Sequence, residues 1–139
     1  MRRSMKVALL MTLVLCLVIP ATGLAKQPVD KGKPHVVTLK VTGIVTHNGV
    51  PDAGAMVTIT GPFGVNKTVK ANVLGRYTAN GIKIVFTCPQ PPDAVWAGNV
   101  SAKSVLGATA SVNLTNEVPL DCSKNPYPIH IKVNLATAP

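Results

Sequence analysis

The chain has 139 residues, and its composition excludes several broad classes of protein. Lysine and arginine outnumber aspartate and glutamate by 14 to 5, so the formal net charge is +9, while aromatic residues make up only 4%. A chain of this length can form one small domain. It lacks the basic residues interleaved with aromatic residues that single-strand binders use, so we expect no nucleic-acid partner.

The first 25 residues have the pattern of a secretory signal peptide. Three basic residues near the start precede an apolar segment at 7–19, and small residues lead up to Ala25. The apolar segment is shorter than a membrane span requires. Cys16 suggests a lipoprotein, but Leu15 stands before it where such a site needs a small residue. We therefore expect cleavage after Ala25, no transmembrane segment afterwards, and a location outside the cell or in its envelope (the periplasm in a Gram-negative bacterium).

The rest of the chain is typical of an all-β domain. Residues 26–139 contain 17 valines, 11 threonines and 6 isoleucines but a single glutamate, and glycine and proline recur throughout. Strand formers therefore dominate over helix formers. We expect a flexible polar leader at 26–34 and a β-sandwich of seven or eight antiparallel strands at 35–137.

The stretch from Val41 to Gly61 predicts a β-hairpin. Apolar residues alternate in a first limb at 41–45 and again in a second limb at 55–59, so each limb has one face suited to a core. Asn48-Gly49 and the segment 52–54 between the limbs supply residues that favour turns.

Further strands follow in order along the chain. Tyr77 is expected in the core, and Asn80-Gly81 indicates a second hairpin before alternating residues at 82–86. Proline-rich loops are expected at 88–96 and 116–126, and strands near 100–102, 110–114 and 129–135. Trp96 lies an even number of residues before Val100, and Tyr127 an even number before Ile129. We therefore expect both side chains on the core face of their segments rather than on a binding surface.

Two cysteines remain after the signal peptide, and they predict a disulfide. Cys88 and Cys122 each lie in one of the proline-rich loops, and an even pair in a secreted domain is typically bridged. A metal or redox pair is the alternative, but the two residues lack the CxxC spacing that would favour it.

Three lysines, Lys40, Lys83 and Lys132, fall between apolar residues of alternating strands and are expected to point outward. One interpretation is a face for an anionic partner such as an acidic polysaccharide, a membrane or a nucleic acid. The other is that spread lysines keep the chain soluble and protect strand edges, and this is favoured because they are not clustered in the sequence.

Three short motifs within residues 36–87 carry a resemblance to a known family. They read Gly43-Ile-Val45, Gly49-Val-Pro51-Asp-Ala-Gly54-Ala55-Met-Val57-Thr-Ile59 and Gly75-Arg-Tyr77. This pattern resembles that of carboxypeptidase regulatory-like domains, which have a seven-stranded prealbumin-like (Ig-like) sandwich. Collagen-adhesin B-type repeats and the pollen-allergen and extensin-like family share the hairpin, and Ala71-Asn72 replaces the Thr-Asp of many relatives. The resemblance implies a non-catalytic accessory, adhesive or structural module outside the cytoplasm.

The titratable residues agree with this expectation of a protein that is not an enzyme. The five acidic residues are scattered singly, and no nucleophile motif or phosphate-binding loop occurs. His35 and His47 are twelve residues apart on one extended segment, so we expect no metal site and no cofactor. Asn66, Asn99 and Asn113 each begin an Asn-X-Ser/Thr triplet, which marks a surface position if the host glycosylates it.

We therefore expect a secreted module that binds a protein or polysaccharide at the cell surface or in the extracellular matrix. The recognition surface is expected on the two bridged loops, at Gln90, Asp93, Lys124 and Asn125, because loops that are already rigid lose little entropy on binding. The alternative is a subunit of an extracellular filament that self-associates by strand pairing.

Overall fold

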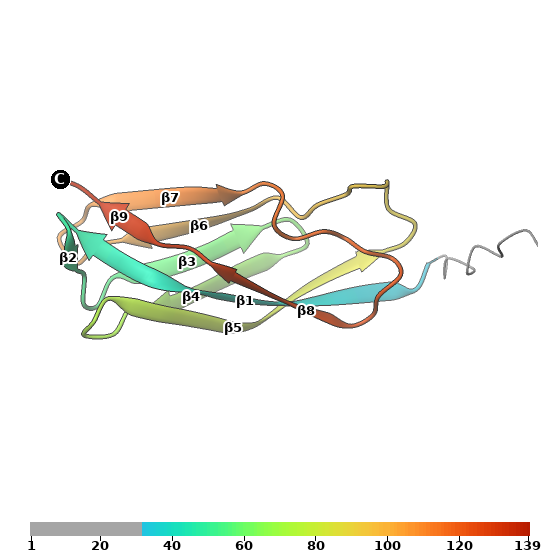
Figure 1. Ribbon diagram of the computed structural model, residues 1–139, viewed down its shortest axis with the longest axis horizontal. Coiled ribbons are helices and arrows are strands. Elements are labelled where there is room, and N and C mark those ends of the chain that lie inside the picture. The colour runs from blue at the N-terminus through green and yellow to red at the C-terminus, as the bar shows by residue number, and fades with distance from the viewer. Residues whose placement is uncertain (1–31) are drawn as a thin grey trace, which may run out of the picture.

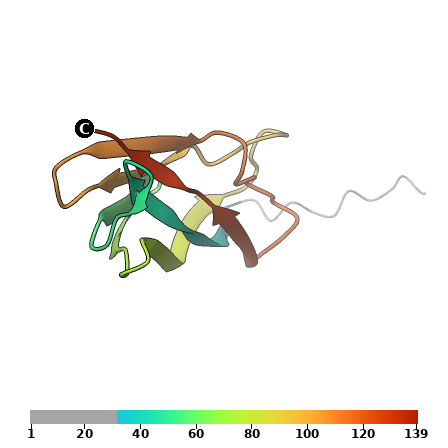
Figure 2. The same cartoon turned by 60° about the vertical axis from the view of Figure 1, so that its left-hand side comes forward.

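The computed structural model describes residues 32–139, which form two packed β-sheets (Figure 1 and Figure 2). The signal peptide expected at 1–25 and most of the leader expected at 26–34 lie outside these residues. The strands are, in chain order, β1 Pro34–His47, β2 Val50–Pro51, β3 Met56–Gly61, β4 Val65–Lys70, β5 Arg76–Thr87, β6 Gly98–Lys103, β7 Thr109–Leu114, β8 Tyr127–Lys132 and β9 Leu135–Thr137.

The long strand β1 is the centre of the first sheet. It pairs with β5 and then β2 along one edge and with β8 and then β9 along the other, while the second sheet has the order β4-β3-β6-β7. The expected all-β sandwich is confirmed, with eight strands longer than the two-residue β2. The expectation that all strands would be antiparallel is wrong for two of them: β8 and β9 run parallel to β1, because the long loop after β7 carries the chain back across the molecule before β8 begins.

The inward rows of the two sheets form a single core. Val37, Leu39 and Val41 of β1 and Val57 and Ile59 of β3 have no exposed surface. Alternate positions along each strand point the same way, so these rows face each other between the sheets.

Tyr77 and Trp96 are both core residues, as the sequence predicted. Tyr77 is 3% exposed, and its hydroxyl donates a hydrogen bond of 2.6 Å to the carbonyl oxygen of Val133. Trp96 is fully buried and lies against Gly61 and Gly98, where an added Cβ would come within 2.2 Å and 2.0 Å of the indole ring.

The hairpin predicted across Val41–Gly61 is wrong in its pairing. Its first limb lies in β1 and its second in β3, and these strands belong to different sheets. The chain turns at Asn48-Gly49, with φ of 51° and 79°, pairs briefly as β2, and then crosses to the other sheet. The two apolar rows therefore pack face to face across the core instead of lying side by side in one sheet.

The second hairpin, predicted at Asn80-Gly81, is also wrong. β5 continues through both residues, and its register with β1 shifts between Leu39 and Val41. Two residues of β5 stand opposite one of β1, which is a β-bulge. Gly81 has a φ of 67°, so the same glycine preference that indicates a turn also suits the bulge.

Candidate functional site

The disulfide between Cys88 and Cys122 is present and joins two loops at one end of the sandwich. The bridge spans a sequence separation of 34 residues, with the two Cα atoms 5.9 Å apart. Cys88 directly follows β5, and Cys122 lies in the loop between β7 and β8. The bridge therefore fixes the second loop against the end of a core strand.

Backbone hydrogen bonds hold the two loops side by side beyond the disulfide. The Trp96 N–H donates to the Val118 carbonyl at 2.8 Å, and the Leu120 N–H donates to the Ala94 carbonyl at 2.8 Å. These bonds flank an isolated antiparallel bridge between Val95 and Pro119. The loops consequently form a short two-stranded connection that closes the end of the core.

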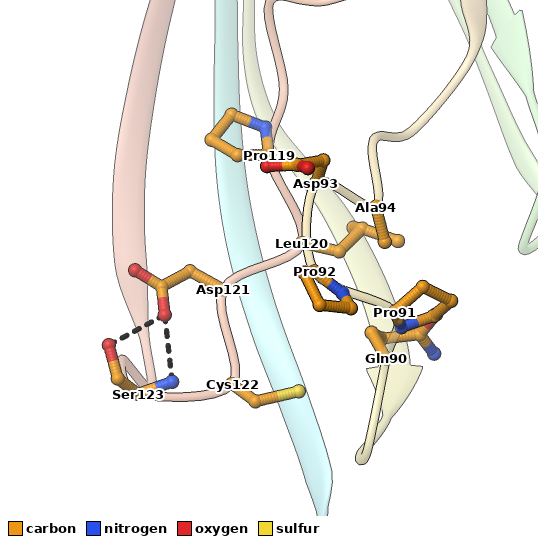
Figure 3. A pocket seen from close by; sticks show the side chains of 10 residues that line it. All are labelled: Gln90, Pro91, Pro92, Asp93, Ala94, Pro119, Leu120, Asp121, Cys122 and Ser123. Atoms are coloured by element: carbon orange, nitrogen blue, oxygen red, sulfur yellow. Dashed lines mark hydrogen bonds between the residues drawn. The ribbon is translucent and has the colours of Figure 1, made fainter.

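A hollow of about 350 Å³ lies where the two loops face each other (Figure 3). Residues 90–94 form one wall and residues 119–123 form the other. Pro91, Pro92 and Pro119 stiffen these walls, because proline fixes its own φ angle. The polar groups at the hollow belong to Gln90, Asp93, Asp121 and Ser123.

Asp121 is held in place by its own loop. One of its carboxylate oxygens, Oδ1, accepts hydrogen bonds from the Ser123 hydroxyl at 2.6 Å and the Ser123 N–H at 2.8 Å. The other, Oδ2, lies 3.2 Å from the Lys124 ammonium. The hydrogen bonds from Ser123, helped by Lys124, hold the pKa of Asp121 below its usual range. Asp121 is therefore negatively charged at neutral pH, and its carboxylate is turned toward Ser123 and away from residues 90–94 (Figure 3).

Tyr127 contacts the second wall of the hollow. Its side chain is 9% exposed, as the alternation of residues at 127–131 predicted. Its hydroxyl donates to the Pro119 carbonyl at 2.6 Å and accepts from the Asp121 N–H at 2.8 Å. Burial raises the pKa of this hydroxyl. Tyr127 thus fixes the shape of the second wall and offers no exposed ring for a ligand.

The four residues predicted for recognition lie in different environments. Gln90 and Asp93 line the hollow, and Lys124 is paired with Asp121 beside it. Asn125 is committed elsewhere, since its Oδ1 accepts the Val36 N–H at 3.0 Å and its Nδ2 donates to the Pro34 carbonyl at 3.1 Å.

Sequence reasoning missed Asp121 and Ser123 as site residues. The available signal was the Asp-X-Ser spacing, in which an aspartate typically accepts hydrogen bonds from the residue two positions later.

The histidines considered for a metal site lie near opposite ends of β1. His35 Nδ1 is 3.2 Å from the Lys124 carbonyl oxygen, and His47 Nδ1 is 2.9 Å from the Thr137 hydroxyl. Within residues 32–139, no three His, Cys, Asp or Glu side chains come together in a way that could hold a metal ion. The same residues contain no helix that is long and apolar enough to cross a membrane.

The three Asn-X-Ser/Thr triplets begin in one row on the outer face of the second sheet. Asn66 stands opposite Thr60, which stands opposite Asn99, and Asn99 stands opposite Asn113. The Asn99 amide donates to the Asn113 side-chain oxygen at 2.8 Å. Residues two apart on a strand lie on the same face. A strand whose outward positions are Asn, Ser and Thr therefore contains Asn-X-Ser/Thr triplets whether or not they are glycosylated.

Comparison with known proteins gives limited similarity. No family model matches the chain, and no curated protein matches it. Among solved structures, Klebsiella pneumoniae 5-hydroxyisourate hydrolase has a TM-score of 0.41 and 17% identity, over 72% of this chain and 90% of that one. The dioxygenase domain of a dioxygenase and carbohydrate-binding protein fusion from Streptomyces sp. SirexAA-E has a TM-score of 0.40 and 13% identity, over 70% and 80%.

The expectation that the chain is not an enzyme needs correction. Two of the solved structures similar to it are a hydrolase and a dioxygenase domain. The sequence argument relied on acidic residues that are far apart in the chain. Folding brings Asp93 and Asp121 to one hollow, and distance along the sequence therefore gave no valid ground for the exclusion.

Proposed function

We propose that this protein is a binding module that acts outside the cytoplasm and recognises a protein or polysaccharide through its disulfide-bridged loops. The observation that carries the proposal is the hollow of about 350 Å³ between two walls joined by a disulfide and by backbone hydrogen bonds. Walls that are already ordered lose little conformational entropy when a ligand binds.

The side chains of the hollow favour a ligand that brings hydrogen-bond donors. Asp93 and Asp121 supply carboxylate oxygens, and Gln90 supplies an amide whose Nε2 is already bonded to the Thr87 carbonyl at 2.7 Å. Both Asp121 oxygens already have partners, so the Asp93 carboxylate is the acceptor that suits the hydroxyl groups of a sugar or the basic side chain of a protein partner. No tryptophan, tyrosine or phenylalanine lines the hollow, so sugar stacking plays no part.

Substitution of Asp93 tests this proposal directly. Asp93→Asn removes one negative charge from the hollow, and we expect binding to isolated cell envelopes of the source organism to weaken about tenfold, as for loss of one important polar contact. The matched control is Glu117→Gln, which removes the same charge from an exposed residue that does not line the hollow. Equal binding by the parent and both variants would rule out the loops as the recognition surface.

A location outside the cytoplasm and membership of the carboxypeptidase regulatory-like domains belong to the same proposal. The disulfide supports the location, because such bonds persist in oxidising compartments. The sandwich and the Asn48-Gly49 turn before Pro51 support the family. Mass spectrometry of the exported protein tests the location, since we expect an amino terminus at Lys26 and no free thiol.

Strand pairing between copies is the second candidate function, and the edge strand β7 favours it. β7 contains no proline and no charged residue, and its inward-facing Val112 is 40% exposed. At the opposite edge, β4 has an exposed lysine, Lys67, at a position that faces inward like that of Val112. A charged residue at such a position discourages another strand from pairing with the edge. We expect Val112→Lys to abolish any filament seen by electron microscopy. A parent protein that stays monomeric at high concentration would eliminate this candidate.

A further inference from the structure

Five basic side chains lie together on the outer face of the first sheet. They are Lys40 from β1, Arg76 and Lys83 from β5, and His130 and Lys132 from β8, and all five are exposed. Their positions in the sequence give no sign of this grouping, because the three strands are far apart along the chain. Figure 1 shows β5, β1 and β8 running beside one another along the length of the molecule.

The strand register arranges these side chains in consecutive rows. Lys83 pairs with position 38 of β1, His130 with position 40, Lys132 with position 42 and Arg76 with position 44. Alternate positions on a strand are about 6.7 Å apart, so the four rows extend over about 20 Å. Every row therefore presents at least one basic side chain, and the row at position 40 presents Lys40 as well as His130.

No acidic side chain compensates this basic face. The four acidic residues of the described chain all lie in segments between strands: Asp52, Asp93, Glu117 and Asp121. Like charges on neighbouring strands destabilise a sheet, and here the cost is not offset by ion pairs on the face. Such a uniformly charged surface attracts ligands of the opposite sign.

The face is also hollowed near the end of β8. A depression of about 330 Å³ is lined by Thr42, Ile44, Arg76, Thr78 and Lys132, together with Gly43 and Tyr77. The depression thus has two cationic side chains and two hydroxyl groups, of which the Thr42 hydroxyl lies 2.9 Å from His130 Nε2. This combination suits a ligand that carries both negative charges and hydroxyl groups.

We propose that this basic face binds an acidic polysaccharide, a polymer that carries carboxylate or sulfate groups beside its hydroxyls. The proposal is independent of the bridged loops. A single-stranded nucleic acid fits less well, because the face has no tryptophan, tyrosine or phenylalanine on which bases could stack. A membrane fits less well, because the strongly exposed aliphatic residues Val73, Leu74, Val105 and Leu106 lie on turns, whereas this face exposes Val85 among its basic residues.

The test uses a variant in which the three lysines of the face are neutralised together: Lys40→Gln, Lys83→Gln and Lys132→Gln. We expect the parent to bind immobilised polygalacturonate or heparin but not dextran, and to bind less tightly at about 200 mM than at about 50 mM salt. The variant should bind about tenfold more weakly, because three exposed ion pairs are lost. Its affinity should also depend less steeply on salt.

The matched control neutralises three exposed lysines of the second sheet: Lys67→Gln, Lys70→Gln and Lys103→Gln. Its net charge equals that of the first variant, and we expect its affinity to stay within about twofold of the parent. Equal loss in both variants would assign the binding to net charge alone and overturn the proposal. Tighter binding of the parent to single-stranded DNA or to phosphatidylserine vesicles would also overturn it, as would full binding by the first variant.

Discussion

Removal of the disulfide should destabilise the protein by an amount that follows from the position of the bridge. Replacing Cys88 and Cys122 with alanine frees a loop whose ends are 34 residues apart in sequence. The chain-entropy relation for a loop of this length gives a loss of about 3 to 4 kcal/mol in the free energy of unfolding. Alanine is preferred to serine because Cys88 is 4% exposed, and a serine hydroxyl there would lack solvent. The melting temperature should fall by about 10 to 25 °C.

Urea unfolding followed by tryptophan fluorescence measures this loss, since Trp96 is the single tryptophan and is fully buried. The parent in reductant should match the alanine variant, which separates the bond from any packing change. Hydrogen exchange should accelerate near residues 121–123 more than at the Trp96 N–H, which stays bonded to Val118. A loss below about 1 kcal/mol would refute the loop-closure argument.

Three further substitutions are expected to lower stability, and urea unfolding measures each. Tyr77→Phe removes the 2.6 Å hydrogen bond to Val133 and should lower the free energy of unfolding by about 1 to 2 kcal/mol. An unchanged free energy of unfolding would contradict this prediction. Gly98→Ala places a Cβ 2.0 Å from the Trp96 ring and should cost about 2 kcal/mol or more, so a neutral result would contradict the packing described. Asn125→Ala removes two hydrogen bonds to the start of β1 and should cost about 1 to 2 kcal/mol, whereas a residue that served only in recognition would leave stability unchanged.

Alternation of apolar residues predicted the burial of side chains better than the pairing of strands. The alternating rows at 41–45 and 55–59 are buried as expected, because odd or even position along a strand decides which face a residue occupies. Whether two rows lie in one sheet or face each other across a core depends on the connection between them. Asn48-Gly49 made the expected turn, but the two residues of β2 ended the pairing and sent the chain to the other sheet.

The candidate sites differ in how far the sequence could reveal them. The bridged loops could be predicted from the sequence, because two cysteines in a domain that is expected to be secreted are typically joined by a disulfide, here Cys88–Cys122. The basic face could not be found in this way. Lys40, Lys83 and Lys132 are separated by more than 40 residues, and only the register of β5 and β8 on β1 brings them together.

The charges of the described chain are separated in space, and this separation bears on both proposals. Three of its four acidic residues lie in the loops at the disulfide end, and two of them line the hollow there. The outer face of the first sheet has only basic residues among its charged side chains. Because one surface attracts cations and donors and the other attracts anions, a single ligand does not suit both. The two proposed sites would therefore hold different partners, and substitutions at one should leave binding at the other intact.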